Sequence, residues 1–352
     1  MARYLLLIFL LLTTSTFAQN SFSTLVTTEH EAGRFNGALL VVKDGQIISQ
    51  INKGYANFQF AVPITSTTRF PIASMTKLFT AILILQLVEK SLLKLDDKAS
   101  LYLPDLPAAC QTITLAELLT HCSGLQNEPS TQVYQTRYST AEFVKKFIVK
   151  NESRKAPAFN YNNLDYILLT RILEVVSKQS FPNLVRHNIL IPLRMHDTGV
   201  VQESRIIPNL AYGYHNYTFG AGSSKDTLRN DAPKYLSNYA GAGAMYSTVT
   251  DLYKLLLALQ TNTLLTAKTT AKLLLKPQQA VFVDQARGYP TAGFYYNDQT
   301  FTKPVLERRG SIDGFNSVLL TDPAFRKAVL ILSNTDTGDL EQLADKLYTE
   351  IH

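Results

Sequence analysis

The chain has 352 residues, of which 46% are hydrophobic and 18% charged, and its formal net charge is +6. This composition is typical of a globular protein, and the length is enough for one large core or two domains in contact. The basic doublets Lys145-Lys146 and Arg308-Arg309 lie far apart in the sequence, so the positive charge is spread out and we expect no nucleic-acid partner.

The first residues are typical of a secretory signal peptide. A short basic region, Met1–Arg3, is followed by the apolar run Leu5–Leu12 and by small residues up to Ala18. The apolar run is too short for a membrane span, which needs about 20 residues. We therefore predict cleavage of residues 1–18, export to the periplasm or the medium, and no integral membrane span afterwards.

The cysteines and histidines carry no metal signature. Cys110 and Cys122 are compatible with a disulfide in an oxidising compartment, and equally with two free thiols. The six histidines show no metal-ligand spacing. We predict no metal and no cofactor.

The first structural signal of the mature chain is a β-hairpin. Two strand-like runs between Asn36 and Ile51 flank Asp44-Gly45, a pair that suits a tight two-residue turn. The later run from Leu78 to Leu93 would leave almost no polar face on a helix. We expect that helix to be buried nearly all round, at the centre of a domain.

The middle of the chain is predicted to be helical. Thr114, Ser139 and Thr248 are each followed three residues later by an acidic residue, just before apolar periodicity, which is the signature of a capping box. A fourth helix is expected to begin at Asn163, where apolar residues recur at helical spacing.

Strand patterns return near the C-terminus, before a last amphipathic helix. The expected strands are Gly293–Tyr296, Lys303–Gly310, Phe315–Thr321 and Lys327–Ser333. We predict an α+β fold, in which residues 19–95 and 276–352 form an antiparallel sheet flanked by helices and residues 96–275 form an inserted all-α domain. A ligand is expected in the cleft between the two domains.

Ser74 and Lys77 are the first candidate catalytic residues. Their spacing puts both side chains on one face in the first turn of the buried helix, where backbone N–H groups favour negative charge on oxygen. A lysine shielded from water can accept the proton of a serine hydroxyl. The pair suggests a nucleophile and its base, although a helix-capping serine and a solvated lysine give the same pattern.

Two further segments carry chemistry only together with this pair. Tyr161 and Asn163 precede a predicted helix; a phenol beside a lysine can shuttle protons, and an amide can hold the lysine and a substrate. In Arg308–Ser311, at the end of a predicted edge strand, Gly310 permits close approach and the Ser311 N–H can point inward. Taken alone, the first segment is equally typical of a loop tyrosine followed by a helix cap, and the second of an exposed basic strand end.

The order of these segments resembles that of the serine β-lactamase and penicillin-binding protein superfamily, specifically the branch of class C β-lactamases, DD-peptidases and related esterases. Six segments carry the resemblance: Asn36–Val42, Phe70–Lys77, Leu118–Leu125, Phe159–Asn163, Gly241–Leu252 and Gly310–Phe315. It implies a β-lactamase/transpeptidase-like fold and acyl-enzyme chemistry.

The resemblance also implies roles for individual residues. Ser74 is the nucleophile, Lys77 and Tyr161 transfer its proton, and Asn163 holds a substrate amide. The N–H groups of Ser74 and Ser311 form the oxyanion hole.

Arg308 and Arg309 depart from the family pattern, in which lysine or histidine is followed by a small residue. We expect Arg308 to keep the cation that recognises a substrate carboxylate. We expect Arg309 to crowd the cleft and to disfavour bulky β-lactams. The segment His121–Gly124 is expected to shape a turn, with no role for His121 as a base.

Three functions fit these residues. The first is an exported serine hydrolase, a monomer that acts through Ser74 on D-Ala-containing peptides or β-lactams. The second is a carboxylesterase for small acyl esters, which needs no cation for a carboxylate. The third is a catalytically weak protein of the same fold that binds peptidoglycan fragments or senses a partner. Arg308 favours the first function, and the complete set of catalytic residue types disfavours the third.

Overall fold

The computed structural model describes residues 21–149, 158–216, 228–274 and 281–351. The predicted signal peptide lies outside the described residues. No helix within these four ranges is long and apolar enough to cross a membrane.

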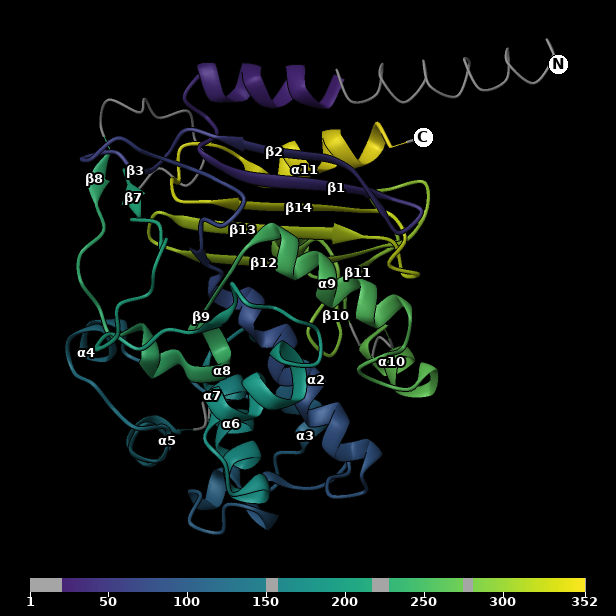
Figure 1. The fold of residues 1–352 in the computed structure, drawn as a ribbon. Coiled ribbons are helices and arrows are strands. Elements are labelled where there is room, and N and C mark those ends of the chain that lie inside the picture. Colours follow the sequence, from purple (N-terminus) through teal and green to yellow (C-terminus); the bar gives the residue numbers. More distant parts are fainter. Residues whose placement is uncertain (1–20, 150–157, 217–227, 275–280, 352) are drawn as a thin grey trace, which may run out of the picture.

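A seven-stranded antiparallel sheet forms one layer of the molecule (Figure 1). In its order, β10-β11-β12-β13-β14-β1-β2, the first strand of the chain pairs with β14, so both ends of the chain build one sheet as predicted. The boundaries between the two predicted domains stay a prediction. The strands are β1 Gly37–Lys43, β2 Gln46–Lys53, β10 Tyr289–Pro290, β11 Tyr295–Asn297, β12 Val305–Ile312, β13 Phe315–Thr321 and β14 Ala328–Ser333.

The hairpin of β1 and β2 closes as predicted. Asp44 and Gly45 both have positive φ, +51° and +73°, which a tight primed turn requires. Lys43 pairs with Gln46 across the turn.

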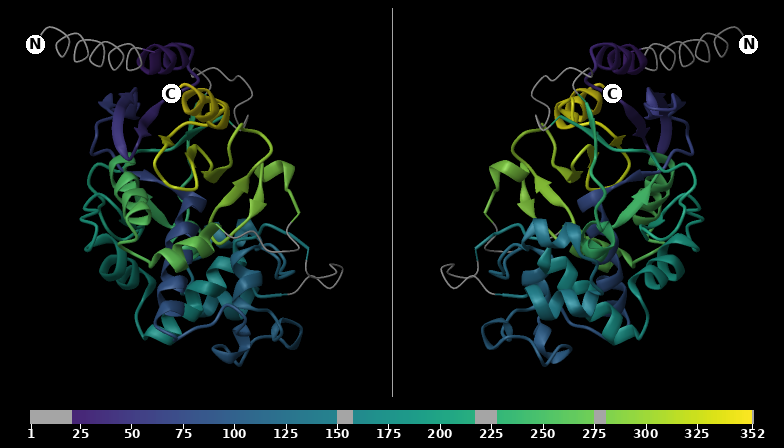
Figure 2. Two further views of the ribbon diagram at one scale, coloured as in Figure 1. Left: turned by 90° about the vertical axis from the view of Figure 1, so that its right-hand side faces the viewer. Right: turned by 90° about the vertical axis from the view of Figure 1, so that its left-hand side faces the viewer.

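Helices cover both faces of this sheet. On one face lie α11 (Leu340–Thr349) and a helix over residues 21–31 (Figures 1 and 2). The side chains of Leu39 and Val41 pack there, whereas those of Leu40 and Val42 belong to the core on the opposite face. Strand β1 is thus buried on both faces, which explains its unbroken apolar sequence.

The opposite core is organised around α2 (Thr76–Glu89). Its side chains are buried from Thr76 through Leu85, so the prediction of a helix buried nearly all round is confirmed. The other α-helices are α3 Leu115–Leu119, α4 Ser130–Gln135, α5 Thr140–Phe147, α6 Leu164–Ser177, α7 Phe181–Val185, α8 Ala240–Gly243, α9 Val249–Gln260 and α10 Ala267–Leu274.

Two of the three predicted capping boxes are complete. The side chains of Thr114 and Ser139 each accept a hydrogen bond from the backbone N–H three residues on. The acidic side chain at that position accepts one from the backbone N–H of the threonine or serine. Thr248 accepts from the Asp251 N–H, but the Asp251 carboxylate bonds elsewhere, to the Asp197 N–H at 2.8 Å. That acid ties a neighbouring loop to α9.

Short strand pairings were missed by the sequence analysis. They are β3 Tyr55–Asn57 with β4 Val62–Pro63, β5 Phe70–Pro71 and β6 Gly199–Val200 with β9 Met245–Ser247, and β7 Tyr214–His215 with β8 Arg229–Asn230. Segments of two or three residues carry no periodic signal. The pairing of β5 with β9 nevertheless matters, because β5 leads directly to Ser74.

The structure decides between the two predicted states of the cysteines. No disulfide joins Cys110 and Cys122; Cys110 is buried and Cys122 is partly exposed. Both are thiols.

Candidate active site

Ser74 lies in a short 3₁₀ turn, η1 (Ala73–Met75), that leads directly into α2. Ala73 has a φ of +45°, a left-handed conformation that is costly for a residue other than glycine. The Ile72 N–H donates to the carbonyl of Met245 in β9 at 2.9 Å, which fixes the turn from outside. The packing of the surrounding core holds Ser74 in place despite the local strain.

Two of the predicted residues, Tyr161 and Lys77, contact the Ser74 hydroxyl. Its Oγ lies 2.6 Å from the Tyr161 Oη and accepts a hydrogen bond from the Lys77 Nζ at 3.1 Å. The Lys77 ammonium also donates to Asn163 Oδ1 at 2.7 Å and to the Ala242 carbonyl at 2.8 Å. The sequence predicted this grouping, and the structure adds Ala242 of α8.

The electrostatics of the site favour proton loss from the two groups that face Ser74. Burial lowers the pKa of Lys77, and the nearby Arg308 cation lowers it further, against an opposing effect of Tyr161. Burial alone would raise the pKa of Tyr161, but the charges of Lys77 and Arg308 outweigh it, so this pKa lies below its usual value. Either group is therefore a better proton acceptor near neutral pH than in water.

Arg308 sits differently from the expectation. Its side chain is only 2% exposed, and its Nε and Nη2 both donate to the Ser74 carbonyl oxygen, at 2.9 and 2.7 Å. This edge of the guanidinium is already used and cannot hold a substrate carboxylate in bidentate form without giving up that contact. The cation still lines the cleft, but it clamps the backbone of the candidate nucleophile.

Gly310 brings β12 against the turn that carries Ser74. A Cβ at this position would lie 2.8 Å from the Ser74 nitrogen and closer still to the Ile72 carbonyl. No other residue type fits this contact without displacing backbone. The close approach predicted for Gly310 is thus to the protein's own chain.

Ser311 lies on the open edge of β12. β11 pairs with β12 only up to Glu307, and beyond it β12 pairs with β13 alone. Ile312 and Phe315 flank a two-residue turn and form a hydrogen-bonded pair, so Ser311 and its partner Asn316 form a non-hydrogen-bonded one. The Ser311 N–H therefore points away from β13, and Ser311 lines the same cavity as Ser74.

Arg309 points away from the Ser74 hydroxyl. Its Nε pairs with Glu307 at 2.6 Å, its Nη2 donates to the Gln285 carbonyl at 2.9 Å, and it also pairs with Glu341 of α11. Arg287 joins the same network through Glu307 at 2.5 Å. Arg309 therefore lines the cleft, and the carboxylates of Glu307 and Glu341 neutralise its charge.

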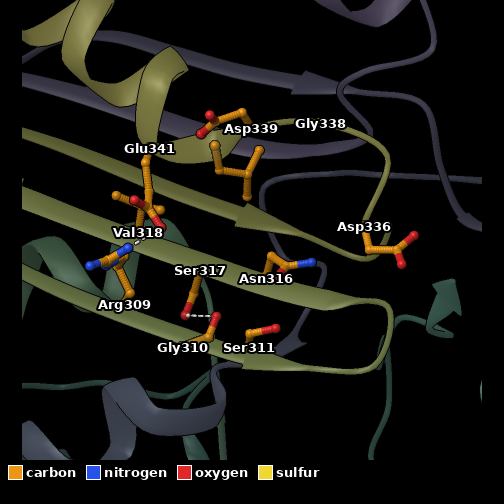
Figure 3. Close-up of a pocket in the computed structure, with 11 residues that line it drawn as sticks. Arg309, Gly310, Ser311, Asn316, Ser317, Val318, Asp336, Gly338, Asp339 and Glu341 are labelled. Atoms are coloured by element: carbon orange, nitrogen blue, oxygen red, sulfur yellow. Dashed lines mark hydrogen bonds and ion pairs between the residues drawn. The ribbon is translucent and has the colours of Figure 1, made fainter. Parts of the chain in front are cut away.

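Two cavities adjoin at Arg309. One, of about 370 Å³, contains Ser74 and is bounded by the aromatic rings of Phe159, Tyr161 and Tyr295. The other, of about 270 Å³, lies around the edge of β12 and shares with the first Arg309, Gly310, Ser311 and Glu341 (Figure 3). The second cavity lies over β12, β13 and the start of α11, and Ser74 does not line it.

Glu128 is a residue of the site that the sequence analysis missed. Its Oε1 accepts the Asn163 Nδ2 at 2.8 Å, which fixes Asn163 between a carboxylate and the Lys77 ammonium. Its Oε2 is buried, and the Tyr239 phenol lies near the same carboxylate. Glu128 lies in a loop without periodic pattern, and no sequence signal singled it out.

Comparison with known proteins places the chain in a family. A family model described as Beta-lactamase matches residues 22–351. The chain belongs to the beta-lactamase family. A teichoic acid D-alanine hydrolase of Staphylococcus aureus is 27% identical to this family member over 321 residues, 91% of this chain and 75% of the relative.

Solved structures show the same fold for this beta-lactamase family member. The D-amino acid amidase of Ochrobactrum anthropi SV3, in complex with L-phenylalanine amide, superposes with a TM-score of 0.80 at 25% identity over 95% of this chain and 97% of the amidase. A penicillin binding protein of Bacillus halodurans gives 0.76 at 26% identity, over 92% and 98%. The predicted β-lactamase/transpeptidase-like fold is confirmed.

The described part of this family member offers no metal centre. In residues 21–149, 158–216, 228–274 and 281–351, no group of three or more His, Cys, Asp or Glu side chains is placed to hold a metal ion.

Proposed function

We propose that this protein is an exported serine hydrolase that forms an acyl-enzyme through Ser74 and releases D-aminoacyl groups, D-alanine in particular, from esters or amides. The observation that carries the proposal is the contact of the Ser74 Oγ with both the Tyr161 Oη and the Lys77 Nζ. A protein that only binds a ligand has no need of a serine activated in this way.

The proposed reaction begins with attack of the Ser74 Oγ on the substrate carbonyl carbon. The serine proton passes to the Tyr161–Lys77 pair, and the N–H groups of Ser74 and Ser311 stabilise the oxyanion. The pair then protonates the leaving alcohol or amine as the carbon–heteroatom bond breaks. Water attacks the acyl-enzyme in the second half-reaction and regenerates the serine.

The position of Glu128 favours a substrate whose acyl group carries a free ammonium. The Glu128 carboxylate lies directly beside the amide of Asn163, the residue expected to hold the acyl portion. A substrate ammonium held there would gain a charge-assisted hydrogen bond from this carboxylate. The named activities of the relatives, on D-alanine in teichoic acid and on D-amino acid amides, agree with this choice.

The test is turnover of a matched panel: a D-alanyl ester, its N-acetyl analogue, a D-Ala-D-Ala peptide and a β-lactam. We expect the free D-alanyl ester to be the best substrate, and the Glu128→Gln variant to lower kcat/KM for it by about 10- to 100-fold, the scale of a charge-assisted hydrogen bond. The N-acetyl ester should change little, because glutamine still accepts from Asn163. Equal losses on both esters, or a preference for the peptide or the β-lactam, would contradict the D-aminoacyl assignment.

Arg308 gives a prediction about pH. The Arg308 charge lowers the pKa of both Lys77 and Tyr161, so Arg308→Ala should raise both and move the acid limb of the kcat/KM profile to higher pH. Arg308→Lys, which keeps the charge but not the two-pronged contact with the Ser74 carbonyl, should leave the limb closer to wild type. A uniform loss at every pH in Arg308→Ala would mean that the residue acts only through the backbone contact.

Export is part of the proposal and rests on residues 1–18. N-terminal sequencing of the protein recovered from the periplasm or the medium should begin at Gln19.

A further inference from the structure

A group of buried polar side chains lies directly behind Tyr161 and takes no part in the proposed reaction. It consists of His121, Ser123, Asn162 and Asp165, each at most 2% exposed. His121 and Ser123 come from the turn after α3, whereas Asn162 and Asp165 come from the start of α6. The group therefore joins two segments that flank Tyr161.

Asp165 is the centre of this group. Its Oδ2 accepts from the Asn162 Nδ2 and bonds to the His121 Nδ1, both at 2.9 Å, and its Oδ1 accepts from the Ser123 hydroxyl. The Asp165 N–H donates in turn to Asn162 Oδ1 at 2.8 Å. A buried carboxylate is tolerated only with partners of this kind, so these contacts fix both segments relative to one another.

The His121 imidazole is the part of the group that contacts Tyr161. The two ring centroids are 4.5 Å apart and the rings are tilted by 46°. The His121 carbonyl also accepts from the N–H of Asn160, the residue before Tyr161, at 2.7 Å. His121 adopts a φ of +58°, which is unusual for a residue other than glycine and brings its ring and its carbonyl to the same loop.

The surroundings of His121 favour a neutral ring. Burial lowers its pKa well below the usual value, and the cations of Lys77 and Arg308 lower it further. The other titratable groups that face it are the Asp165 carboxyl and the phenols of Tyr161 and Tyr166. The contact of Nδ1 with Asp165 holds the orientation of the neutral ring, which adds no third positive charge to the site.

We propose that His121, oriented by Asp165, is a positioning residue that holds the Tyr161 hydroxyl against the Ser74 Oγ. The inference rests on the proposed function, in which Tyr161 transfers the serine proton. Displacing a catalytic group by about 1 Å costs up to about 10²-fold in rate. The imidazole face prevents the phenol ring from tilting back into the space behind it.

The experiment is a double-mutant cycle on turnover of the D-alanyl ester. His121→Ala should lower kcat by about 10- to 100-fold with little change in KM, because the residue does not touch substrate. In a Tyr161→Phe background, where no hydroxyl remains to be positioned, His121→Ala should cause no further loss. His121→Phe keeps a ring on Tyr161 and should recover part of the lost rate.

Ser123→Ala is the matched control, because it removes one donor from the same carboxylate and leaves the ring contact intact. We expect it to lower the melting temperature with a kcat within about threefold of wild type. Full additivity of His121→Ala and Tyr161→Phe would overturn the inference, as would an equal loss of kcat in Ser123→Ala. If His121→Ala does not fold, the same cycle with His121→Phe decides, with additivity again as the contrary result. Wild-type rates in Tyr161→Phe would instead overturn the proposed function itself.

Discussion

Ser74→Ala is expected to abolish covalent labelling and to lower kcat/KM by roughly 10⁴- to 10⁶-fold, the scale on which removing a serine nucleophile acts in other hydrolases. The fold should survive the substitution. The turn that holds Ser74 shows no side-chain cap, and neither does the start of α2. Lys77 keeps its acceptors on Asn163 and Ala242.

The measurement is the burst of leaving group together with thermal melting. Ser204→Ala, at an exposed serine, is the control and should behave as wild type. Residual turnover within tenfold of wild type in a folded Ser74→Ala protein would mean that another group attacks the substrate.

Lys77→Met is expected to give the second-largest effect, a loss of about 10²- to 10⁴-fold in kcat with KM little changed. The thioether has nearly the length of the lysine side chain but accepts no proton from Ser74. The substitution also removes the Lys77 cation, which lowers the pKa of Tyr161. Both groups that could take the serine proton are therefore impaired by one substitution.

The effect of Lys77→Met on stability should be small. The variant leaves Asn163 Oδ1 and the Ala242 carbonyl without their donor, which costs about 1–3 kcal/mol, but it also removes the cost of burying an ammonium. Lys90→Met, on the exposed end of the same helix, is the control for the substitution itself. An unchanged kcat in Lys77→Met would show that neither lysine nor its charge is needed.

The sequence predicted the parts of the site that depend on local spacing. Ser74 and Lys77 are three residues apart at the start of a helix, so their side chains had to lie on one face. The meeting of Tyr161 with Ser74, across 87 residues of chain, followed only from the resemblance to a family. Periodicity and capping likewise predicted the long strands and helices, and they missed most strands of two or three residues.

The geometry of β12 could not be predicted, because it depends on tertiary contacts. The absence of a Cβ at Gly310 lets the strand approach the turn of Ser74, and Arg308 then reaches the Ser74 carbonyl instead of open solvent. Arg309, on the alternate face, meets Glu341 of a helix that follows in the sequence. The sequence showed the two charges but not which partners would take them.

Glu128, which bears on substrate specificity, could not be predicted from the sequence either. A glutamate in a loop has no sequence signature, and its importance comes only from the contact with Asn163. Arg308 in the sequence favoured a substrate carboxylate, whereas the clamp on Ser74 and the position of Glu128 favour a substrate ammonium. The substrate class that we propose therefore differs from the one expected from the sequence: D-aminoacyl esters and amides in place of peptides and β-lactams.

The most direct test of the acyl-enzyme account is to trap the intermediate on the wild-type protein. A D-alanyl ester is mixed with the enzyme, the reaction is quenched in acid within the first turnover, and the digested peptides are analysed by mass spectrometry. The account predicts one added alanyl group on the peptide that contains Ser74, and none in Ser74→Ala. An adduct on a different residue, or rapid turnover with no adduct at any quench time, would contradict it.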